Sequence, residues 1–315
     1  MNISIIIPTR NRPTQILECL NHLSNQSLLP DEVLIVSSGD SIKHIINKFE
    51  KKININYIQS ELASQIHQRN LGKENINRKS DFVLFLDDDV LLEASAIQKI
   101  MEFWDTKDNK TAGIGFNLIY PNSDSKPFLF NLYKLLYKSK PGSITKSGMP
   151  IAYSNLSSNI ETQYLCGGAT VWRRKILEEY KQETINTSWA QGEDLRFSYP
   201  IGQKYKLFAC ATAVGREIEF ENENISSPFT QGKLQGLTDL YFTTLHIELS
   251  TSLALCTLII KIFINILTIK KISYGIGQLF AFFIFIKLLF MVNVMMRLKG
   301  PCFLIKKRLF MKIYS

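Results

Sequence analysis

Nine residues decide the fold class of this chain: Asp81-Phe82-Val83-Leu84-Phe85-Leu86-Asp87-Asp88-Asp89. The consecutive apolar residues predict a strand buried on both faces, as in a parallel sheet covered by helices. Three carboxylates directly after such a strand repel one another and are costly to bury, and a divalent cation removes that cost. The stretch therefore predicts an α/β fold with a metal site at the end of a strand. The alternative is a polar loop that caps the helical segment after it.

The same alternation extends in both directions along the chain. We expect a mostly parallel central sheet flanked by helices, with ligands at the carboxyl ends of the strands. Residues 121–163, rich in Ser, Asn, Lys, Pro and Tyr, predict a long loop or insert over the site. Apolar runs predict strands at 3–8, 32–36, 53–58, 81–86, 112–120 and 203–214, and helical spacing predicts helices at 13–25, 42–49, 63–73, 93–105, 173–180 and after 193.

The charge is distributed unevenly along the 315 residues, which carry a formal net charge of +9. Residues 251–315 hold ten Lys or Arg and no Asp or Glu, which leaves 27 basic and 28 acidic residues in the rest. A nucleic-acid-binding domain would carry its own basic patch, so we expect no nucleic-acid partner. The five cysteines form no CxxC pair, which argues against a zinc site or a disulfide framework. Because no secretory leader is evident, we expect the body to fold in the cytoplasm.

Two apolar windows near the C-terminus, residues 250–268 and 276–294, predict a membrane-associated helical hairpin. If both helices span the bilayer, Lys270 and Lys271 in the turn face outward, against the positive-inside tendency. A shallow hairpin in the cytoplasmic leaflet avoids this conflict, and both arrangements stay open. The basic tail after Met296 suits anionic headgroups. A third alternative is two buried helices of a soluble domain.

Six short motifs, taken in their order and spacing, resemble glycosyltransferase family 2, whose members have the A-type glycosyltransferase fold. The resemblance covers about residues 1–220 and implies a catalytic domain at 1–225, with a nucleotide-sugar half (1–120) and an acceptor half (121–225). A linker at 226–249 and the membrane-associated hairpin with its basic tail at 250–315 complete the expected organisation. The motifs are Ile-Ile-Ile-Pro-Thr-Arg-Asn-Arg at 5–12, Pro-Asp-Glu-Val-Leu-Ile-Val at 30–36, Gln-Arg-Asn-Leu-Gly at 68–72, residues 81–89, Gly-Gly-Ala at 167–169 and Gly-Glu-Asp at 192–194.

The resemblance implies a role for each matching residue. Asp194 is expected to be the general base, with Glu193 orienting the acceptor or the base; the alternative is that both only supply negative charge to the first turn of a helix. Asp87 and Asp89, on one side of an extended segment, are the expected ligands of Mn²⁺ or Mg²⁺. The expected acceptor-binding residues also include Gly167, Gly168 and Trp189, and the expected nucleotide-sugar-binding residues are Pro8, Thr9, Arg10, Ser38, Asp40, Arg69, Asp87, Asp88 and Arg216.

Several of these positions keep a second interpretation. Arg69 pairs either with phosphate or with a carboxylate, and Trp189 either stacks on a sugar or belongs to the core. The turn at 36–40, Val-Ser-Ser-Gly-Asp, lacks the Asp that usually holds the nucleotide base, so Ser38 or Asp40 must substitute. The family's usual His after the last core strand is replaced by Gly215-Arg216-Glu217, where Arg216 is either a diphosphate clamp or a loop ion pair.

These observations predict a metal-dependent inverting glycosyltransferase of the hexosyl or deoxyhexosyl class. It would move a sugar from a nucleoside-diphosphate sugar to a hydroxyl of a glycan or lipid-linked glycan. We expect it at the cytoplasmic face of the inner membrane, in bacterial surface polysaccharide assembly. The alternatives are transfer to a polyprenyl phosphate, and a non-catalytic, membrane-anchored nucleotide- or sugar-binding protein. The sequence leaves the sugar, the base and the oligomeric state open.

Overall fold

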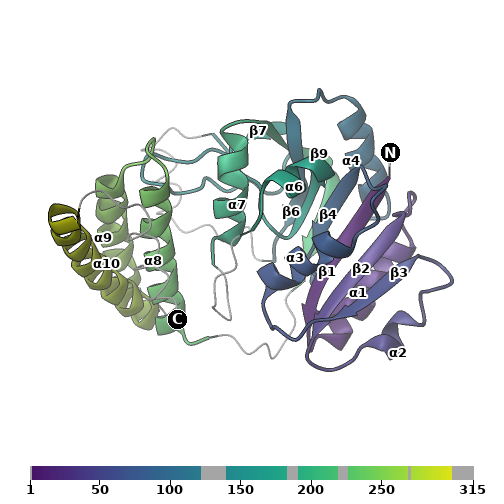
Figure 1. Ribbon diagram of the computed structural model, residues 1–315, viewed down its shortest axis with the longest axis horizontal. Coiled ribbons are helices and arrows are strands. Elements are labelled where there is room, and N and C mark those ends of the chain that lie inside the picture. The colour runs from purple at the N-terminus through teal and green to yellow at the C-terminus, as the bar shows by residue number, and fades with distance from the viewer. Residues whose placement is uncertain (1, 122–139, 183–190, 219–225, 269–270, 300–315) are drawn as a thin grey trace. The chain divides into compact units, whose positions relative to one another are not determined.

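The computed structural model describes residues 2–121, 140–182, 191–218, 226–268 and 271–299, with side chains up to Met291 (Figure 1). The chain forms two compact units. The first comprises residues 1–143, 151–184 and 193–221, and the second comprises residues 144–150, 185–192 and 222–315.

The central sheet of the first unit begins as the sequence predicts, with parallel strands. Their order, β3-β2-β1-β4, places the first strand of the chain inside the sheet, where its side chains are buried on both faces. Neighbouring parallel strands end at the same edge, which brings the residues after β1, β2 and β4 together. The bounds are β1 (Ile3–Arg10), β2 (Glu32–Ser38), β3 (Ile55–Gln59) and β4 (Phe82–Leu86).

Beyond β4 the sheet becomes mixed. β8 (Ala169–Arg173) runs antiparallel between β4 and β6 (Thr111–Ile119). β6 pairs in parallel with β9 (Lys206–Glu217), and both β5 (Val90–Leu92) and β7 (Ile160–Thr162) pair antiparallel with β9. Because β8 is reversed, its first residues lie beside the last residues of β4: the Asp87 N–H donates to the Gly168 carbonyl at 2.8 Å.

Helices cover both faces of this sheet (Figure 1). On the face of Ile3, Ile5 and Ile7, the core is completed by α1 (Pro13–Ser24), α2 (Lys43–Ile46) and α4 (Ala96–Asp105). On the face of Ile6, α6 (Arg174–Glu179) and α7 (Glu193–Gly202) contribute the core residues, and α3 (Gln65–Asn75) packs close. Gly72 permits the close approach of α3, because a Cβ there would lie 2.5 Å from Ile6 Cγ2.

The expected α/β fold is confirmed, and the differences are local. Helix α2 is shorter than the predicted 42–49, and strands β5 and β8 were not predicted. In the predicted loop at 121–163, the described residues include β7 and an antiparallel bridge between Ile144 and Pro150. These are three- to five-residue elements whose hydrogen bonds come from distant strands, so no local periodicity marks them.

The second unit contains three packed helices: α8 (Pro228–Leu245), α9 (Thr251–Leu267) and α10 (Ile272–Lys299). The segment expected as a linker, 226–249, thus contains helix α8. Small residues allow α8 and α10 to approach closely, because a Cβ on Gly232 would lie 2.0 Å from the Tyr274 carbonyl oxygen and one on Gly236 2.8 Å from Ala281 Cβ. Leu240, Leu258 and Phe285 fill the core between the helices.

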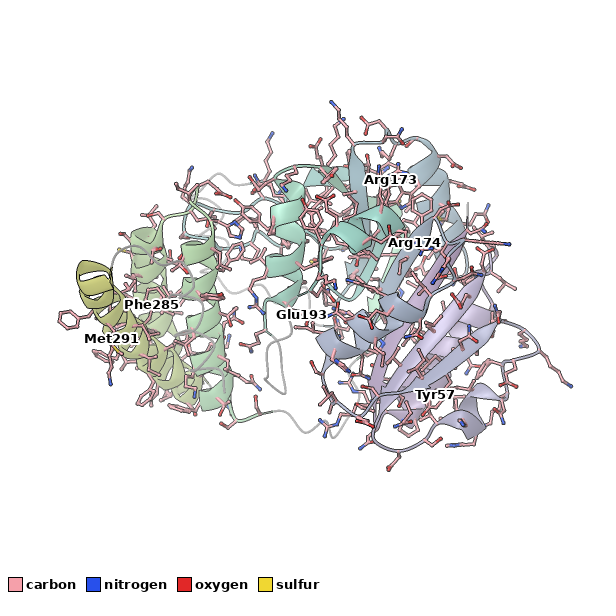
Figure 2. All side chains as sticks on the ribbon, viewed as in Figure 1. Tyr57, Arg173, Arg174, Glu193, Phe285 and Met291 are labelled. Carbon is pink, nitrogen blue, oxygen red and sulfur yellow. The ribbon has the colours of Figure 1, made fainter. Side chains whose placement is uncertain are left out.

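The outward surface of α9 and α10 is apolar. Phe263, Phe283 and Phe290 are 66%, 62% and 70% exposed, whereas Phe285 is buried (Figure 2). Polar side chains pair between helices: Lys261 Nζ lies 3.0 Å from Asp239 Oδ2, and Asn265 Nδ2 donates to Gln278 Oε1 at 2.9 Å. Within the described residues, one helical stretch, Ile272–Met291, has the length and apolar composition of a membrane span, with a mean hydropathy of 1.8. Helix α9, with 17 residues, is apolar but shorter.

Candidate active site

The three consecutive carboxylates after β4 have different surroundings. The middle one, Asp88, is 2% exposed and accepts hydrogen bonds from Thr9 Oγ1 at 2.5 Å and from Arg12 Nη1 at 2.8 Å. Asp88 therefore joins the end of β1 to the turn after β4, and its side chain turns away from the cavity that its neighbours line. Arg12 also contacts Asp89, with 3.1 Å between Nη1 and Oδ2. Sequence reasoning missed Arg12, which lies two residues beyond β1.

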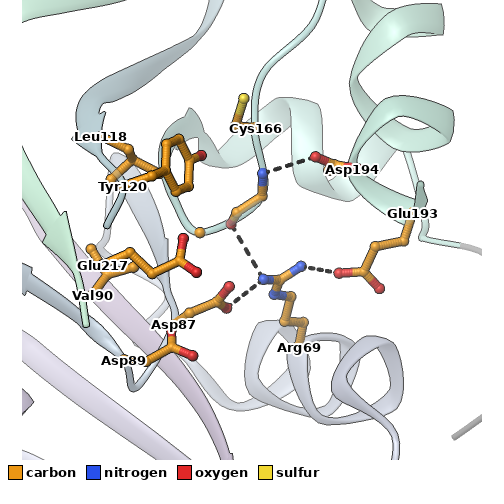
Figure 3. Close-up of a pocket in the computed structure, with 12 residues that line it drawn as sticks. Arg69, Asp87, Asp89, Val90, Leu118, Tyr120, Cys166, Glu193, Asp194 and Glu217 are labelled. Atoms are coloured by element: carbon orange, nitrogen blue, oxygen red, sulfur yellow. Dashed lines mark hydrogen bonds and ion pairs between the residues drawn. The ribbon is translucent and has the colours of Figure 1, made fainter. Parts of the chain in front are cut away.

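A cavity of about 290 Å³ opens where the strand ends meet (Figure 3). It combines residues from the turn after β4, from β5, from the end of β6 and the residue after it, from β9 and α3, from the turn before β8 and from the start of α7. Seven of the predicted site residues line it together: Arg69, Asp87, Asp89, Gly167, Gly168, Glu193 and Asp194. Five further residues that sequence reasoning missed complete the lining: Val90, Leu118, Tyr120, Cys166 and Glu217.

Arg69 links the two sides of this cavity. Its guanidinium is 1% exposed and contacts Asp87 Oδ1 through Nη2 at 2.6 Å and Glu193 Oε1 through Nη1 at 2.5 Å. Nη2 also donates to the Gly167 carbonyl at 3.3 Å. Burial works against the charge, but Asp87 and Glu193 outweigh it, and the pKa of Arg69 rises above its ordinary value. The sequence allows Arg69 to pair either with a phosphate or with a carboxylate, and in the structure it pairs with two carboxylates.

Asp194 lies at the first turn of α7 with its carboxylate held by the backbone. Oδ1 accepts from the Leu195 N–H at 2.8 Å, and Oδ2 accepts from the Gly167 N–H at 3.2 Å. Burial raises the pKa of Asp194, and these backbone donors, followed by Arg69, partly oppose that rise. Asp194 therefore supplies negative charge to the first turn of α7, and it also lines the cavity. Its interpretation as a helix-terminal charge is thus compatible with its interpretation as a general base.

Two other carboxylates of the cavity have strongly raised pKa values. Burial, together with Asp87 and Asp88, raises the pKa of Asp89 to about 7, with Arg12 opposing. Burial raises the pKa of Glu193 to about 7, although Arg69 opposes it. Glu193 Oε2 is buried without a hydrogen-bond partner. Groups that resist ionisation in a cleft are typical of functional sites.

The oxygen ligands of the cavity fit a hard divalent cation. Asp87 and Asp89 both line it, and burial, followed by repulsion from Asp87 and Asp88, disfavours the charged form of Asp89, a cost that a bound cation would relieve. Within the described residues, no three His, Cys, Asp or Glu side chains are grouped closely enough to hold a metal by themselves. Mg²⁺ sites commonly use one or two carboxylates together with substrate phosphates, so the ion would be bound together with its substrate.

The remaining predicted residues lie outside the cavity. Pro8, Thr9 and Ser38 are buried at the ends of β1 and β2, and Arg10 and Asp40 are exposed there. Gln68 fixes this edge, because its Nε2 donates to the carbonyls of Thr9 at 2.7 Å and Val36 at 2.6 Å. Trp189 lies outside the described residues.

Arg216 does not line the cavity. Its Nη2 lies 2.9 Å from Glu93 Oε1 in an exposed pair, which corresponds to the loop ion pair of the two sequence interpretations. The next residue of β9, Glu217, lines the cavity instead. Successive side chains of a strand point to opposite faces, so Arg216 and Glu217 are expected on opposite faces of β9. This alternation does not indicate which of the two faces the cavity.

The comparisons with known proteins agree with this geometry. The family model for glycosyl transferase family 2 matches residues 4–181. The chain belongs to glycosyltransferase family 2 and is a glycosyltransferase with the A-type fold.

Two curated proteins are similar in sequence. The O-antigen chain rhamnosyltransferase RfbN of Salmonella typhimurium is 28% identical over 218 residues, which cover 69% of this chain and 66% of the rhamnosyltransferase. Chondroitin synthase of Escherichia coli is 34% identical over 112 residues, which cover 34% of this chain and 16% of that protein. The chain thus spans just under two thirds of the first relative and a small part of the second.

Among solved structures, TarS of S. aureus has a similar fold. The TM-score is 0.53 at 18% identity, over 84% of this chain and 43% of TarS. A structure of TarS residues 1–349 in complex with UDP-GlcNAc has a TM-score of 0.52 at 18% identity, over 84% of this chain and 72% of that one.

Proposed function

We propose that this protein is a metal-dependent inverting glycosyltransferase. It transfers a sugar from a nucleoside-diphosphate sugar to a hydroxyl of a glycan or a lipid-linked glycan. One observation carries the proposal: the carboxylates suited to a cation, Asp87 and Asp89, and the buried carboxylate Asp194 line the same cavity. A diphosphate and an attacking hydroxyl bound in it would lie on either side of one anomeric carbon.

In this proposal Asp194 is the general base. The acceptor oxygen attacks the anomeric carbon while its proton passes to the Asp194 carboxylate, and the bond from that carbon to the diphosphate oxygen breaks with inversion. The raised pKa of Asp194 favours this role, because a base is most effective when its pKa approaches the working pH.

Two neighbouring residues position the reactants. Glu193 has one oxygen paired with Arg69, and its other oxygen, Oε2, is available to accept from an acceptor hydroxyl. Arg69 holds Glu193 and Asp87 in place and thereby fixes the two sides of the cavity. Gly167 and Gly168 leave room for a sugar beside the backbone.

Asp87 and Asp89 would hold Mn²⁺ or Mg²⁺. A bound cation neutralises charge on the departing diphosphate and orients it. The nucleotide would lie over the ends of β1 and β2, near Thr9, Arg10, Ser38 and Asp40. The buried hydroxyl of Ser38 has no hydrogen-bond partner in the protein, which supports a contact with the base or ribose. The UDP-GlcNAc bound to TarS supports a nucleotide-sugar donor as a class.

We propose the cytoplasmic face of the bacterial inner membrane as the site of action. The exposed apolar surface of α9 and α10 and the basic residues of 251–315 favour an anionic bilayer. The similarity to an O-antigen rhamnosyltransferase supports surface polysaccharide assembly as the setting, with a glycan or lipid-linked acceptor.

A donor screen on detergent-purified protein tests the proposal. UDP-, GDP- and dTDP-sugars are assayed for binding and slow hydrolysis with Mn²⁺ or Mg²⁺, in parallel with Asp89→Ala. We expect one donor class to bind and turn over with metal, and Asp89→Ala to abolish the response. No metal-dependent response to any donor would favour the non-catalytic alternative.

Asp194→Asn distinguishes the two enzymatic alternatives. Transfer to a hydroxyl requires a base, and we expect this variant to lose at least ~100-fold in kcat while still binding the donor. Transfer to a polyprenyl phosphate requires no deprotonation, so a variant with nearly full activity would support that acceptor instead.

A further inference from the structure

Helix α8 lies beside α10, and the two helices run in the same direction (Figure 1). Gly232 leaves no room for a side chain next to the Tyr274 carbonyl, and a Cβ on Gly236 would lie 2.8 Å from Ala281 Cβ. These contacts follow one another in the same order along both helices. In any placement of the second unit against a bilayer, α8 therefore lies at the same depth as the part of α10 beside it.

The composition of α8 is unsuited to the core of a bilayer. Its 18 residues include Gln231, Lys233, Gln235 and Asp239. Ionisable side chains in the hydrocarbon core are costly. In the part of the chain that the structure describes, the helical stretch with the length and composition of a span belongs to α10 and not to α8. If α10 crossed the bilayer, the polar side chains of α8 would enter the hydrocarbon with it.

Both ends of α8 are joined to the first unit by short stretches of chain. Residues 222–227 lead from the first unit to the start of α8. Beyond its other end, the Ser250 N–H donates to the Lys146 carbonyl at 2.7 Å. Lys146 belongs to a turn, 144–150, which the chain enters from the first unit and leaves to return to it.

This connection is incompatible with a membrane-spanning α8. A helix that crosses the bilayer has its ends on opposite sides, and 18 residues of helix are about 27 Å long. The turn that holds Ser250 could reach the far side only as irregular chain passing through hydrocarbon, where its backbone polar groups would lack partners. Because α8 does not cross, α10, which lies at the same depth, does not cross either.

The surface left for the membrane is the outward side of α9 and α10. Phe263 on α9 and Phe283 and Phe290 on α10 are among its most exposed apolar side chains. An apolar surface of this kind, in a segment with ten basic and no acidic residues between 251 and 315, suits an anionic bilayer as its partner.

We infer that α9 and α10 lie in the plane of the membrane, with their exposed apolar side chains in the cytoplasmic leaflet, and that none of α8, α9 and α10 crosses the bilayer. This inference rests on the proposed location at the cytoplasmic face. Helices bound in this way are immersed to about 5–10 Å. Of the arrangements that the sequence leaves open, the structure thus favours the shallow hairpin.

Two cysteine reporters on the full chain distinguish the possible topologies. Ser252→Cys lies at the start of α9 and Ser273→Cys at the start of α10, and both serines are exposed. Ser158→Cys, at an exposed residue of the first unit, is the matched control. Bacterial spheroplasts and inverted inner-membrane vesicles are treated with a membrane-impermeant maleimide, and the label on each peptide is quantified by mass spectrometry. Detergent-solubilised protein provides the fully accessible reference.

We expect Ser252→Cys and Ser273→Cys to behave like the control, labelled in inverted vesicles and unlabelled in spheroplasts. Label on Ser273→Cys in spheroplasts would show that α9 and α10 span as a hairpin, and label on Ser252→Cys would show that α8 spans. Either result, or protection of either site in both preparations, overturns the inference. The proposed glycosyl transfer is measured separately by donor turnover and would stand in each case.

A depth measurement gives an independent readout. Ile276, Phe283 and Phe290 follow one another at seven-residue intervals on α10 and are 45%, 62% and 70% exposed. Each is replaced singly by a fluorophore-labelled cysteine, and quenching by lipids brominated at different depths is measured in phosphatidylglycerol vesicles. We expect one shallow depth for all three sites. Steps of about 10 Å between them, the length of seven helical residues, would show a spanning helix and overturn the inference.

The control for depth is a labelled Leu62→Cys, at an exposed residue of the first unit, which should not be quenched. A second copy of the chain is the competing partner for the apolar surface. Absence of quenching at all three α10 sites, together with a dimer in light scattering, would show that a second copy covers this surface and would overturn the inference.

Discussion

Arg69 and Glu193 are 124 positions apart in the sequence, yet Arg69 Nη1 and Glu193 Oε1 lie 2.5 Å apart in the lining of the cavity. Since Arg69 also contacts Asp87, one guanidinium joins the strand-end carboxylates to the helix that carries Asp194. Arg69→Met should leave two carboxylates without their cation and lower the free energy of unfolding by about 3–5 kcal/mol. Arg69→Lys keeps the charge but not the two-pronged geometry, and kcat should fall about 100-fold.

Urea unfolding and initial rates check these effects. The matched control is Arg174→Lys, since Arg174 forms an exposed pair with Glu178 at 2.9 Å, and it should change stability by less than about 1 kcal/mol. Full activity in Arg69→Lys would mean that the two separate contacts of the guanidinium, with Asp87 and with Glu193, have no role in positioning these carboxylates.

The aspartates at 87–89 should separate into structural and metal-binding roles. Asp88→Ala removes the acceptor for Thr9 and Arg12, so we expect a stability loss of about 3–5 kcal/mol. Asp89→Ala removes a carboxylate that its neighbours repel, so it should unfold close to the wild type but lose Mn²⁺ binding. Urea unfolding and calorimetric titration with Mn²⁺ in the presence of a nucleoside diphosphate measure the two properties. Mn²⁺ binding retained in Asp89→Ala would refute the assignment of this ligand.

The pH profile should reflect the buried carboxylates. Burial raises the pKa of Asp194 above its ordinary value and raises the pKa of Glu193 to about 7. In the proposed mechanism Asp194 must be deprotonated, and Glu193 must be charged to pair with Arg69, so activity is gained as pH rises through the raised pKa of each group and lost as pH falls. We expect kcat/KM, at saturating metal, to fall at least about tenfold per pH unit below about pH 7, and more steeply where both groups are protonated. A flat profile down to pH 5 would contradict the role of both groups.

The apolar surface of α9 and α10 should bind lipid. Phe263→Asp combined with Phe283→Asp removes two exposed aromatic rings, each worth about 1.5–3 kcal/mol when buried. Binding to vesicles of phosphatidylglycerol and phosphatidylethanolamine should weaken at least ~100-fold in a flotation assay. Leu62→Asp, at a residue 56% exposed in the catalytic unit, is the control and should bind like the wild type.

The pair of Asp239 and Lys261 should be energetically coupled. Both side chains are 29% exposed and 3.0 Å apart between α8 and α9. Asp239→Asn and Lys261→Met should each destabilise the protein, and the double variant should lose less than the sum, with a coupling of about 0.5–1 kcal/mol. Thermal unfolding in detergent measures the cycle, and strict additivity would show that the pair contributes nothing.

The amino-acid sequence predicts the first half of the fold well, for a physical reason. Strands β1, β2 and β4 are buried on both faces, so they are apolar runs that can be recognised locally. Strand β8 was missed because its five residues follow Gly167 and Gly168, which indicate a turn, and because both of its partners are distant in sequence.

The sequence predicts most of the charged residues of the site and the two glycines before β8, but not Glu217 or the apolar part of the lining. Aspartates at strand ends and an Arg on a helix are conspicuous, because such residues are costly to bury without a purpose. Val90, Leu118 and Tyr120 look like ordinary core residues of strands, and nothing local distinguishes a side chain that lines a cavity from one beside it. Arg216 and Glu217 are adjacent, and only the tertiary pairing of β9 shows which one faces inward.

The direction of β8 determines which segments of the chain can contribute residues to the same cavity. Had this strand run parallel to its neighbours, Gly167 and Gly168 would lie at the opposite edge, about 17 Å away over five residues. Because β8 runs antiparallel to β4, Gly167 and Gly168 instead line the same cavity as Asp87 and Asp89, which come from an earlier part of the chain. If the turn before β8 and the start of α7 bind the acceptor as proposed, substitutions there would alter which molecule receives the sugar without disturbing the strand ends proposed to hold the nucleotide. Such a chain would diversify its products through one of its halves while the other stays fixed.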